Sequence, residues 1–276
     1  MLSSEIITSR NNPLVKYAAS LLDKKGRRAE RAFIAEGLKL CLEAIETGMP
    51  ITHVLVCENN AQEIIPRITR ALSDADLPDV AISVLSVSAF EKISTEKAPQ
   101  GVITVIKHLD FSINADIIYK EEFFLTQNEK AIALCSVRDP SNLGAVIRSA
   151  VAFGVDKIVL SPDCADVYNT KTVRSAMGSL FRVKIITVGN MEDFVAKARD
   201  NGRRVFAAEL TEGAISLSDI TLLPTDVMII GNEGHGIPAS LSKACNGSVY
   251  IPIGGGVESL NASVAASVLI WEQFKR

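Results

Sequence analysis

The chain has 276 residues, of which 47% are apolar and 22% are charged, and its formal net charge is −3. A chain of this length forms one large domain or two ordinary ones, with a core that burial alone can stabilise. The small negative charge excludes a protein that binds nucleic acid through its overall charge, so any such contact has to come from a local basic patch.

The first 107 residues alternate between helical and strand patterns of apolar side chains. The helices predicted from spacing and from Pro and Gly positions are 13–22, 38–45 and 64–72. The predicted strands are 31–36, 53–57, 80–84 and 101–106. This alternation predicts a small α/β domain over residues 1–107.

Residues 108–129 mix charged and apolar side chains without a clear period, which indicates a linker. Beyond it, residues 130–276 alternate again, and strand 131–137 is apolar almost throughout, as expected when both faces of a strand are covered. The further predicted strands are 157–160, 183–187, 204–208, 226–231 and 248–252, and the predicted helices are 143–153, 170–180, 191–201 and 260–274. This pattern predicts a doubly wound parallel sheet, in which ligands bind at the carboxyl ends of the strands.

The five cysteines are scattered, odd in number and without a C-x-x-C pair. Such spacing is typical of reduced thiols and indicates neither a disulfide framework nor a zinc site. The N-terminus carries Glu5 and no long apolar stretch, and no apolar run approaches the roughly 20 residues of a membrane span. We therefore expect a cytoplasmic protein without a metal site.

The first motif, 138–144, follows the apolar strand 131–137 and leads into a helix. An ordinary strand-to-helix turn, with Pro140 and Ser141 in the turn and Asn142 as cap, explains these residues equally well. Arg148 is different, because its helical neighbours are apolar and a guanidinium in that setting needs an anionic partner. An RNA phosphate would suit its planar fork of donors.

The second motif, Gly231–Gly236, places three glycines directly after an apolar strand. Glycine permits positive φ angles and the close approach of a ligand. The following residues, 237–241, indicate the start of a helix rather than the second strand of a hairpin. Asn232 and Glu233 would then offer donor and acceptor groups at the tip of the strand, while His235 is expected to be an exposed loop residue.

The third motif, Ile251–Asn261, combines a strand end, three consecutive glycines and the sequence Glu-Ser-Leu-Asn before the last helix. A capped helix explains one polar residue, Ser259 or Asn261, but not the whole motif. The G-x-G-x-x-G spacing of a dinucleotide-binding loop is not met, because no third glycine stands at the required place. Backbone N–H groups at this helix start could also hold a ligand carboxylate.

In order and spacing, these three motifs closely resemble those of the SpoU-type (TrmH-like) RNA ribose 2′-O-methyltransferases, a branch of the SPOUT superfamily. Residues 163–182 and 33–38 are also similar to that family. The resemblance implies a parallel sheet closed by a trefoil knot, preceded by a small α/β substrate-binding domain. It further implies a homodimer with the active site at the subunit interface, and S-adenosylmethionine as the methyl donor.

The resemblance also assigns roles to individual residues. The implied catalytic and substrate-positioning set is Asn142, Arg148, Glu233, Ser259 and Asn261. The implied donor-binding residues are Leu210, Gly231, Asn232, Gly234, Ile251, Ile253 and Leu260. The resemblance implies that Arg148 lies near the ribose hydroxyl as the deprotonating group or its helper. Because arginine stays protonated, we expect Arg148 to bind phosphate and assist electrostatically rather than act as a literal base.

RNA contacts are expected from the local cluster of positive charge at 24–31, although a merely solvated face would have the same composition. The residues proposed for RNA binding are Lys24, Lys25, Arg27, Arg28, Arg31 and Arg174. Ribosomal RNA is the preferred substrate, and transfer RNA is the alternative. Two other hypotheses remain. The first is an RNA-binding protein that has kept the fold without turnover. The second is a nucleotide-dependent oxidoreductase, although the G-x-G-x-x-G fingerprint of that class is missing from the sequence.

Overall fold

The computed structural model describes residues 5–77, 79–109, 125–126, 128–232, 234–254, 256 and 259–275. The chain divides into two compact units. The first contains the described residues up to Leu109 together with Asp166–Phe181, and the second contains the described residues within 110–165 and 182–276. The sequence pattern places 166–181 within the predicted second domain, 130–276, whereas the structure groups these residues with the first unit. Most of the proposed linker, with Glu233, Gly255 and Glu258, lies outside the described residues.

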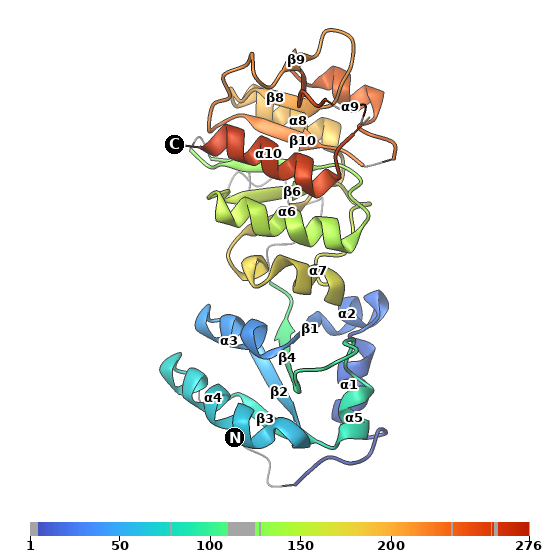
Figure 1. Ribbon diagram of the computed structural model, residues 1–276, viewed down its shortest axis with the longest axis vertical. Helices are drawn as coiled ribbons and strands as arrows, with labels where there is room; N and C mark the ends of the chain where they lie inside the picture. Colours follow the sequence, from blue (N-terminus) through green and yellow to red (C-terminus); the bar gives the residue numbers. More distant parts are fainter. Residues whose placement is uncertain are drawn as a thin grey trace. The chain divides into compact units, whose positions relative to one another are not determined.

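The first unit contains a four-stranded mixed sheet in the order β1-β4-β2-β3 (Figure 1). Strand β4 is antiparallel to both β1 and β2, whereas β2 and β3 are parallel. The strands are β1 (Ala32–Glu36), β2 (Ile51–Cys57), β3 (Ala81–Leu85) and β4 (Val102–Lys107). The helices of this unit are α1 (Pro13–Ser20), α2 (Lys24–Glu30), α3 (Leu38–Glu46), α4 (Ala61–Asp74), α5 (Val87–Glu91) and α7 (Thr170–Ala176). The predicted small α/β domain is thus confirmed, with α2 and α5 as helices that the sequence pattern missed.

Helix α2 was missed because its sequence, KKGRRAE, is short, charged and interrupted by glycine. Gly26 is required by packing, since a Cβ built there would lie 2.0 Å from the carbonyl oxygen of Ser20 at the end of α1. Glycine at position 26 therefore allows α2 to pack closely against α1. Arg27, the next residue of α2, is buried.

Residues 166–181 complete the core of the first unit, where α7 contacts β1. The ring of Tyr168 stacks on Phe33 and on His108, with centroid distances of 4.7 Å and 4.2 Å. Its hydroxyl donates a hydrogen bond to the carbonyl oxygen of Leu109 at 2.9 Å. The helix predicted over 170–180 ends earlier, because Met177 and Gly178 have φ angles of 49° and 81°, in the left-handed region.

The second unit contains a seven-stranded sheet in the order β7-β6-β5-β10-β8-β11-β9, and every strand pair in it is parallel. The strands are β5 (Ala131–Leu134), β6 (Lys157–Leu160), β7 (Lys184–Thr187), β8 (Val205–Ala208), β9 (Ile215–Ser216), β10 (Val227–Ile230) and β11 (Gly247–Tyr250). The predicted parallel sheet is confirmed. Among the described strands, only the two-residue β9 was not predicted.

Helices lie on both faces of this sheet (Figure 1). They are α6 (Pro140–Ala152), α8 (Met191–Asp200), α9 (Ala239–Ala244) and α10 (Ala262–Phe274). Helices α8 and α9 pack on the face that carries Ala133, Val159 and Ile229, all of them buried, while α6 packs beside α10. Strand β10 lies between β5 and β8, so the loops that follow these three strands emerge side by side at one edge. Within the described part of the chain, no helix is long and apolar enough to cross a membrane.

Candidate functional site

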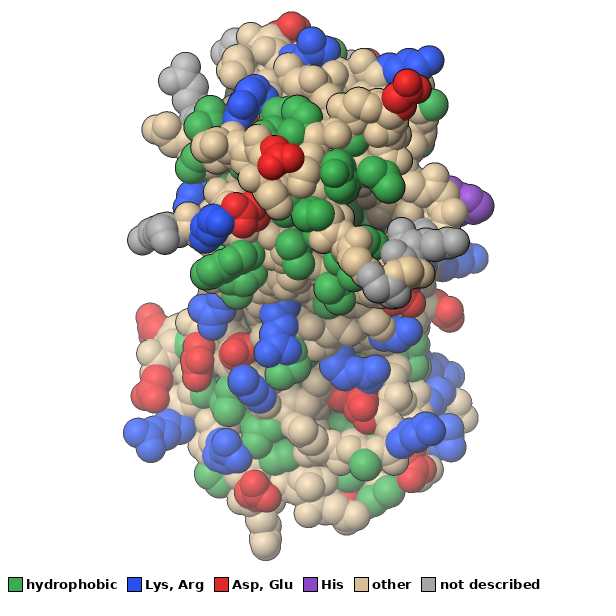
Figure 2. All heavy atoms as spheres, turned by 45° about the horizontal axis from the view of Figure 1, so that its top comes forward, with side chains coloured by type: hydrophobic (Ala, Val, Ile, Leu, Met, Phe, Trp, Pro, Cys, Tyr) green, Lys and Arg blue, Asp and Glu red, His purple; other side chains and the backbone are tan. Residues whose placement is uncertain are grey.

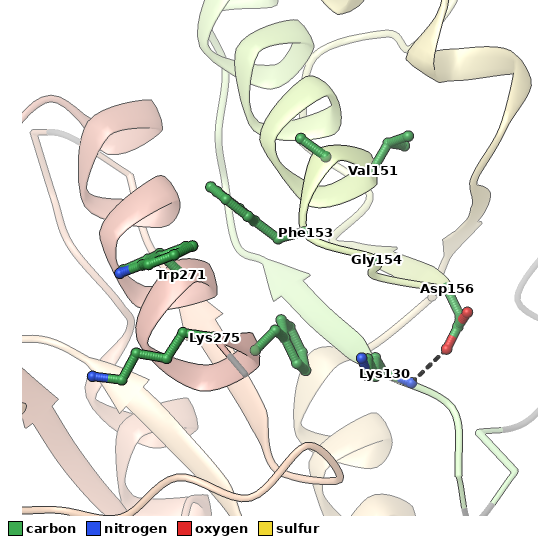
Figure 3. A pocket seen from close by; sticks show the side chains of 9 residues that line it. Lys130, Val151, Phe153, Gly154, Asp156, Trp271 and Lys275 are labelled. Carbon is green, nitrogen blue, oxygen red and sulfur yellow. Dashed lines mark hydrogen bonds between the residues drawn. The ribbon is translucent and has the colours of Figure 1, made fainter.

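Two of the hollows formed by the described residues of the second unit lie at opposite edges of the sheet. One, of about 700 Å³, lies where α6 and α10 end, and Figure 3 shows Phe153 and Trp271 on its walls. Lys130 and Asp156, which also line it, stand directly before β5 and β6, and the Lys130 backbone N–H donates to the Asp156 carboxylate at 2.9 Å. This hollow is therefore at the amino-terminal edge, where doubly wound sheets do not usually bind ligands.

The other hollow, of about 830 Å³, lies at the carboxyl-terminal edge. Its walls come from the loops after β8, β10 and β11 and from the first turns of α10. The lining residues are Ala208, Glu209, Leu210, Ile230, Gly231, Asn232, Gly236, Val249, Tyr250, Ile251, Pro252, Ile253, Ser259, Leu260, Ala262, Ala265 and Leu269. Since this is the edge at which parallel sheets place their ligands, it is the candidate site, and we call it the donor cavity.

All the predicted donor-binding residues except Gly234 line the donor cavity. The sequence did not identify Glu209, Tyr250 or Ala265, which also line it. Glu209 and Tyr250 stand at the carboxyl ends of β8 and β11. Because ligands bind at the carboxyl ends of parallel strands, the predicted strand ends are the signal that identifies these two residues. Ala265 is on the first turns of α10, where its small apolar side chain resembles any other core position.

The donor cavity suits S-adenosylmethionine in size and chemistry. Its volume falls within the roughly 300–1,000 Å³ that is usual for small-ligand pockets. Its lining includes leucine, isoleucine and valine residues, which can provide apolar contacts for an adenosine ring, together with residues of three loops, whose backbone groups can hydrogen-bond to the polar edges of the ring. Among the described residues, no group of three or more His, Cys, Asp or Glu side chains is arranged to hold a metal ion.

The loop 231–236 is shaped by its own hydrogen bonds. The side-chain oxygen of Asn232 accepts from the backbone N–H groups of Gly234 and His235, at 2.8 Å and 3.1 Å. A Cβ at Gly231 would lie 2.7 Å from the carbonyl carbon of Gly236. The glycine at 231 is therefore required for the loop to close on itself, which is a more local reason than the close approach of a ligand.

The first and third motifs meet through their asparagine side chains. The amide nitrogen of Asn261 donates to the side-chain oxygen of Asn142 at 3.0 Å. The side-chain oxygen of Asn261 also caps α10 by accepting from the Ser263 N–H at 2.9 Å. Helix α6 is capped by Asp139 instead, which accepts from the N–H of Asn142 at 3.0 Å. The suggested capping role of Asn142 is therefore wrong, and its side chain faces the third motif.

Arg148 is exposed on α6, six residues after Asn142, or about 9 Å along the helix axis. It is not one of the residues that line the donor cavity, and no ion pair joins it to another residue that the structure describes. Ser259 does line the cavity, whereas Glu233 is outside the described residues. Of the proposed catalytic residues, the structure thus joins Asn142 to Asn261 and places Ser259 in the wall of the donor cavity.

A polar network joins the tips of β5 and β6. The Asp163 carboxylate accepts hydrogen bonds from the hydroxyls of Ser161 and Ser136, at 2.6 Å and 2.7 Å, and from the Arg138 guanidinium at 2.8 Å. Burial raises the pKa of Asp163, but these hydrogen bonds lower it by more, to about 2. The carboxylate is therefore ionised throughout the physiological range.

The predicted RNA-binding residues belong to the first unit, and they differ in exposure and in ion pairing. Lys24, Lys25, Arg28 and Arg31 are exposed. Arg174 is half-exposed and forms an ion pair with Glu96.

Arg27 contradicts the prediction, because it is 2% exposed. Its guanidinium donates to Asp166 at 2.7 Å and to the carbonyl oxygens of Leu21 and Leu22, at 2.9 Å and 2.7 Å. A guanidinium that is buried and engaged in this way stabilises the fold and does not face a phosphate. The prediction failed because one side of the unrecognised helix α2 faces the core.

Comparisons with known proteins match both units. Residues 129–271 match the SpoU rRNA Methylase family, and residues 12–104 match the MRM3-like substrate binding domain. The chain is 31% identical, over 265 residues, to the 23S rRNA (guanosine(2553)-2′-O)-methyltransferase RlmP of Bacillus subtilis, a match that covers 96% of this chain and 97% of the relative.

Two solved structures are similar over nearly the whole chain. The AdoMet-bound rRNA methyltransferase from Sinorhizobium meliloti has a TM-score of 0.82 and 28% identity, covering 98% of this chain and 97% of that one. An RNA 2′-O ribose methyltransferase has a TM-score of 0.80 and 25% identity, covering 98% of both chains.

Proposed function

The chain belongs to the SpoU rRNA Methylase family, and from this membership we propose that it transfers the methyl group of AdoMet (S-adenosylmethionine) to a ribose 2′-hydroxyl of RNA. One observation carries the proposal. The three motifs, which are far apart in sequence, meet at the carboxyl-terminal edge of the parallel sheet, where Asn261 donates to Asn142 beside a cavity of suitable size. The preferred substrate is ribosomal RNA, in line with the name of the Bacillus subtilis relative, and action on it would place the enzyme in the cytoplasm.

The donor would be held by the walls of the donor cavity. We assign this role to Leu210, Gly231, Asn232, Ile251, Ile253 and Leu260, which line it. When bound there, AdoMet supplies a methyl group that the positive charge of its sulfonium has already activated. The protein then has to position the ribose hydroxyl and to favour the loss of its proton to solvent water as the new O–CH3 bond forms and the S–CH3 bond breaks.

Arg148 is suited to the second of these tasks. It is exposed on the same helix as Asn142, and its guanidinium carries a positive charge. A fixed positive charge of this kind can bind an RNA phosphate and stabilise negative charge that develops on the ribose oxygen. The amides of Asn142 and Asn261 and the hydroxyl of Ser259 are proposed to orient the ribose.

A homodimer is the second part of the proposal. Val264, Val268 and Trp271 follow each other on the outer side of α10 and are 48%, 36% and 53% exposed. Figure 2 shows hydrophobic side chains gathered on the half of the molecule where α10 lies in Figure 1. The opposite side of α10 is buried, and a helix that is apolar on both sides is usually covered in the assembled protein. Trp271 also lines the hollow in Figure 3, which extends the apolar surface.

The enzymatic proposal is tested with the purified protein, AdoMet labelled in its methyl group, and transcripts of 23S ribosomal RNA or transfer RNA. We expect label in ribosomal RNA, as nucleotides that resist alkaline hydrolysis, because a methylated 2′-oxygen cannot attack the neighbouring phosphate. The first nucleotide to examine is the equivalent of guanosine 2553. Label that appears on bases, or on transfer RNA alone, would contradict the proposal as stated. If calorimetry shows RNA binding but no AdoMet binding, the result would instead support the alternative hypothesis of an RNA-binding protein that has kept the fold without turnover.

The dimer is tested by light scattering on the variant Val264→Asp/Val268→Asp. We expect a monomer, while Ile6→Asp, which alters a 49% exposed side chain of the first unit, should leave the mass unchanged. An unchanged mass for the double variant would remove α10 from the interface.

A further inference from the structure

Arg138 stands at the edge of the sheet that carries the donor cavity, immediately before the residue that caps α6. Its side chain is 62% exposed, yet one end of it is fixed, because the guanidinium donates to the Asp163 carboxylate at 2.8 Å. Asp163 is fixed in turn by the hydroxyls of Ser136 and Ser161. An exposed arginine with an anchored guanidinium is therefore part of a network rather than a single surface pair.

This network reaches the wall of the donor cavity. Ser136 has a φ of 58°, a left-handed conformation that a serine seldom adopts. Its backbone N–H donates to the Ser161 hydroxyl, and its carbonyl oxygen accepts from the side-chain amide of Asn232, both at 2.8 Å. Asn232 lines the donor cavity. Arg138 is thus two residues from a backbone group that is hydrogen-bonded to the cavity wall.

The free part of the guanidinium suits a phosphate. Arginine carries five N–H donors in a planar fork, and the bond to Asp163 uses one of them. Holding the side chain in place reduces the entropy that a ligand has to remove when it binds. The negative charge of Asp163 is offset by its three donors, so it opposes an incoming phosphate less than an isolated carboxylate would.

We propose that Arg138 is a further RNA-binding residue, which contacts a backbone phosphate beside the methylated nucleotide, and that Asp163 is the positioning residue that holds it there. This inference rests on the proposed function. It extends that function by placing a phosphate contact at the first residue of the first motif, whereas Arg148 follows the end of that motif on α6.

An ordinary surface ion pair would have the same geometry at Arg138 and Asp163, and such pairs contribute little to stability. The two explanations differ in a way that can be measured. The variant Asp163→Asn removes a negative charge, so simple electrostatics predicts tighter RNA binding. If Asp163 acts by positioning Arg138, the same variant should bind RNA more weakly.

The test uses the full-length protein and a transcript of 23S ribosomal RNA. Binding and initial methylation rates are measured at several salt concentrations for Arg138→Ala, Asp163→Asn and the double variant. The matched control is Arg199→Ala, which removes an exposed arginine at the end of α8, where Arg199 donates to the carbonyl oxygen of Ala244 at 2.7 Å. AdoMet affinity by calorimetry and the melting temperature of each variant show whether the strand tip stays intact.

We expect Arg138→Ala to raise KM for RNA roughly tenfold while kcat and AdoMet affinity stay unchanged, since a hydrogen bond to a charged group has about that effect. The slope of log K against log salt should fall by about 0.7–0.9, as for the loss of one phosphate contact. Asp163→Asn should raise KM as well, and the double variant should be no worse than Arg138→Ala.

Three outcomes would overturn the inference: tighter RNA binding by Asp163→Asn, an Arg138→Ala variant that matches Arg199→Ala, or loss of AdoMet affinity in parallel with RNA affinity. Failure of the proposed function is recognised separately, because the unaltered protein would then show no methyl transfer. The salt dependence of RNA binding would still report on Arg138 in that case.

Discussion

The side chains of Asn142 and Asn261 are joined by a hydrogen bond of 3.0 Å across 119 residues of sequence. Asn142 lies in the first turn of α6, Asn261 caps α10, and these two helices of the second unit pack against each other. Asn261 has two separate tasks, because its oxygen caps α10 while its nitrogen donates to Asn142. The geometry of the proposed ribose-binding groups therefore depends on helix capping.

Asn261→Ala should lower the free energy of unfolding by about 1–2 kcal/mol, since it removes the cap of α10 together with the bond between the motifs. Asn261→Asp keeps an oxygen for the cap and should preserve stability while it loses the donor to Asn142. We therefore expect Asn261→Asp to be stable but slow in methyl transfer. Chemical denaturation and steady-state kinetics measure the two effects. Equal losses of stability in both variants would show that capping is not the source of the effect.

Arg148→Ala should reduce kcat for methyl transfer at least about 100-fold, as for the loss of one group that stabilises developing charge. AdoMet affinity should stay unchanged, because Arg148 does not line the donor cavity. Arg148→Lys keeps the charge without the planar fork, so its kcat should lie between that of the unaltered protein and that of Arg148→Ala. Turnover close to that of the unaltered protein in Arg148→Ala would remove the residue from the mechanism.

Arg27→Ala should lower the free energy of unfolding by about 3–5 kcal/mol, because it leaves the partly buried carboxylate of Asp166 without its partner. The neighbouring Arg28 is exposed, and Arg28→Ala should change the same quantity by no more than about 0.5 kcal/mol. Thermal or urea unfolding distinguishes the two residues. A stable Arg27→Ala protein that binds RNA poorly would restore the original RNA-binding prediction.

The acid stability of the protein should depend in part on Asp163. Its pKa falls from 3.8 to about 2 on folding, so its ionised form stabilises the native state above pH 3.8. That contribution is lost as the pH falls toward 2. Since Asp163 and Arg138 are both solvent-exposed, screening limits it to about 1 kcal/mol or less. The difference in unfolding free energy between the unaltered protein and Asp163→Asn should therefore narrow between pH 5 and pH 2, and a constant difference would contradict the assignment.

Most elements of the fold could be predicted from the sequence, because long apolar periods dominate their patterns. Strands β5 and β10 of the parallel sheet are apolar on both faces, and all four residues of each are buried. The exceptions have physical causes. Helix α2 is too short and too charged to show a period, and helix α7 ends early because Met177 adopts a left-handed conformation.

The position of the donor cavity followed from the rule for parallel sheets, whereas the arrangement of side chains within it did not. Composition cannot distinguish the exposed Arg28 from the buried Arg27, since that difference depends on which side of α2 faces the core. In the same way, sequence cannot show that Asn142 faces the third motif while Asp139 supplies the cap. Both facts depend on contacts between residues far apart in the chain or on the local direction of one helix.

The grouping of 166–181 with the first unit limits how this protein can be divided or recombined. A shortened protein that starts after Leu109 would retain Tyr168 but lose Phe33 and His108, the two rings on which it stacks. Exchanging the first unit for that of a relative would likewise require the replacement of two segments of the chain, the residues up to Leu109 and the residues 166–181. Evolution of substrate choice in this architecture is therefore expected to couple changes in two separate stretches of the gene.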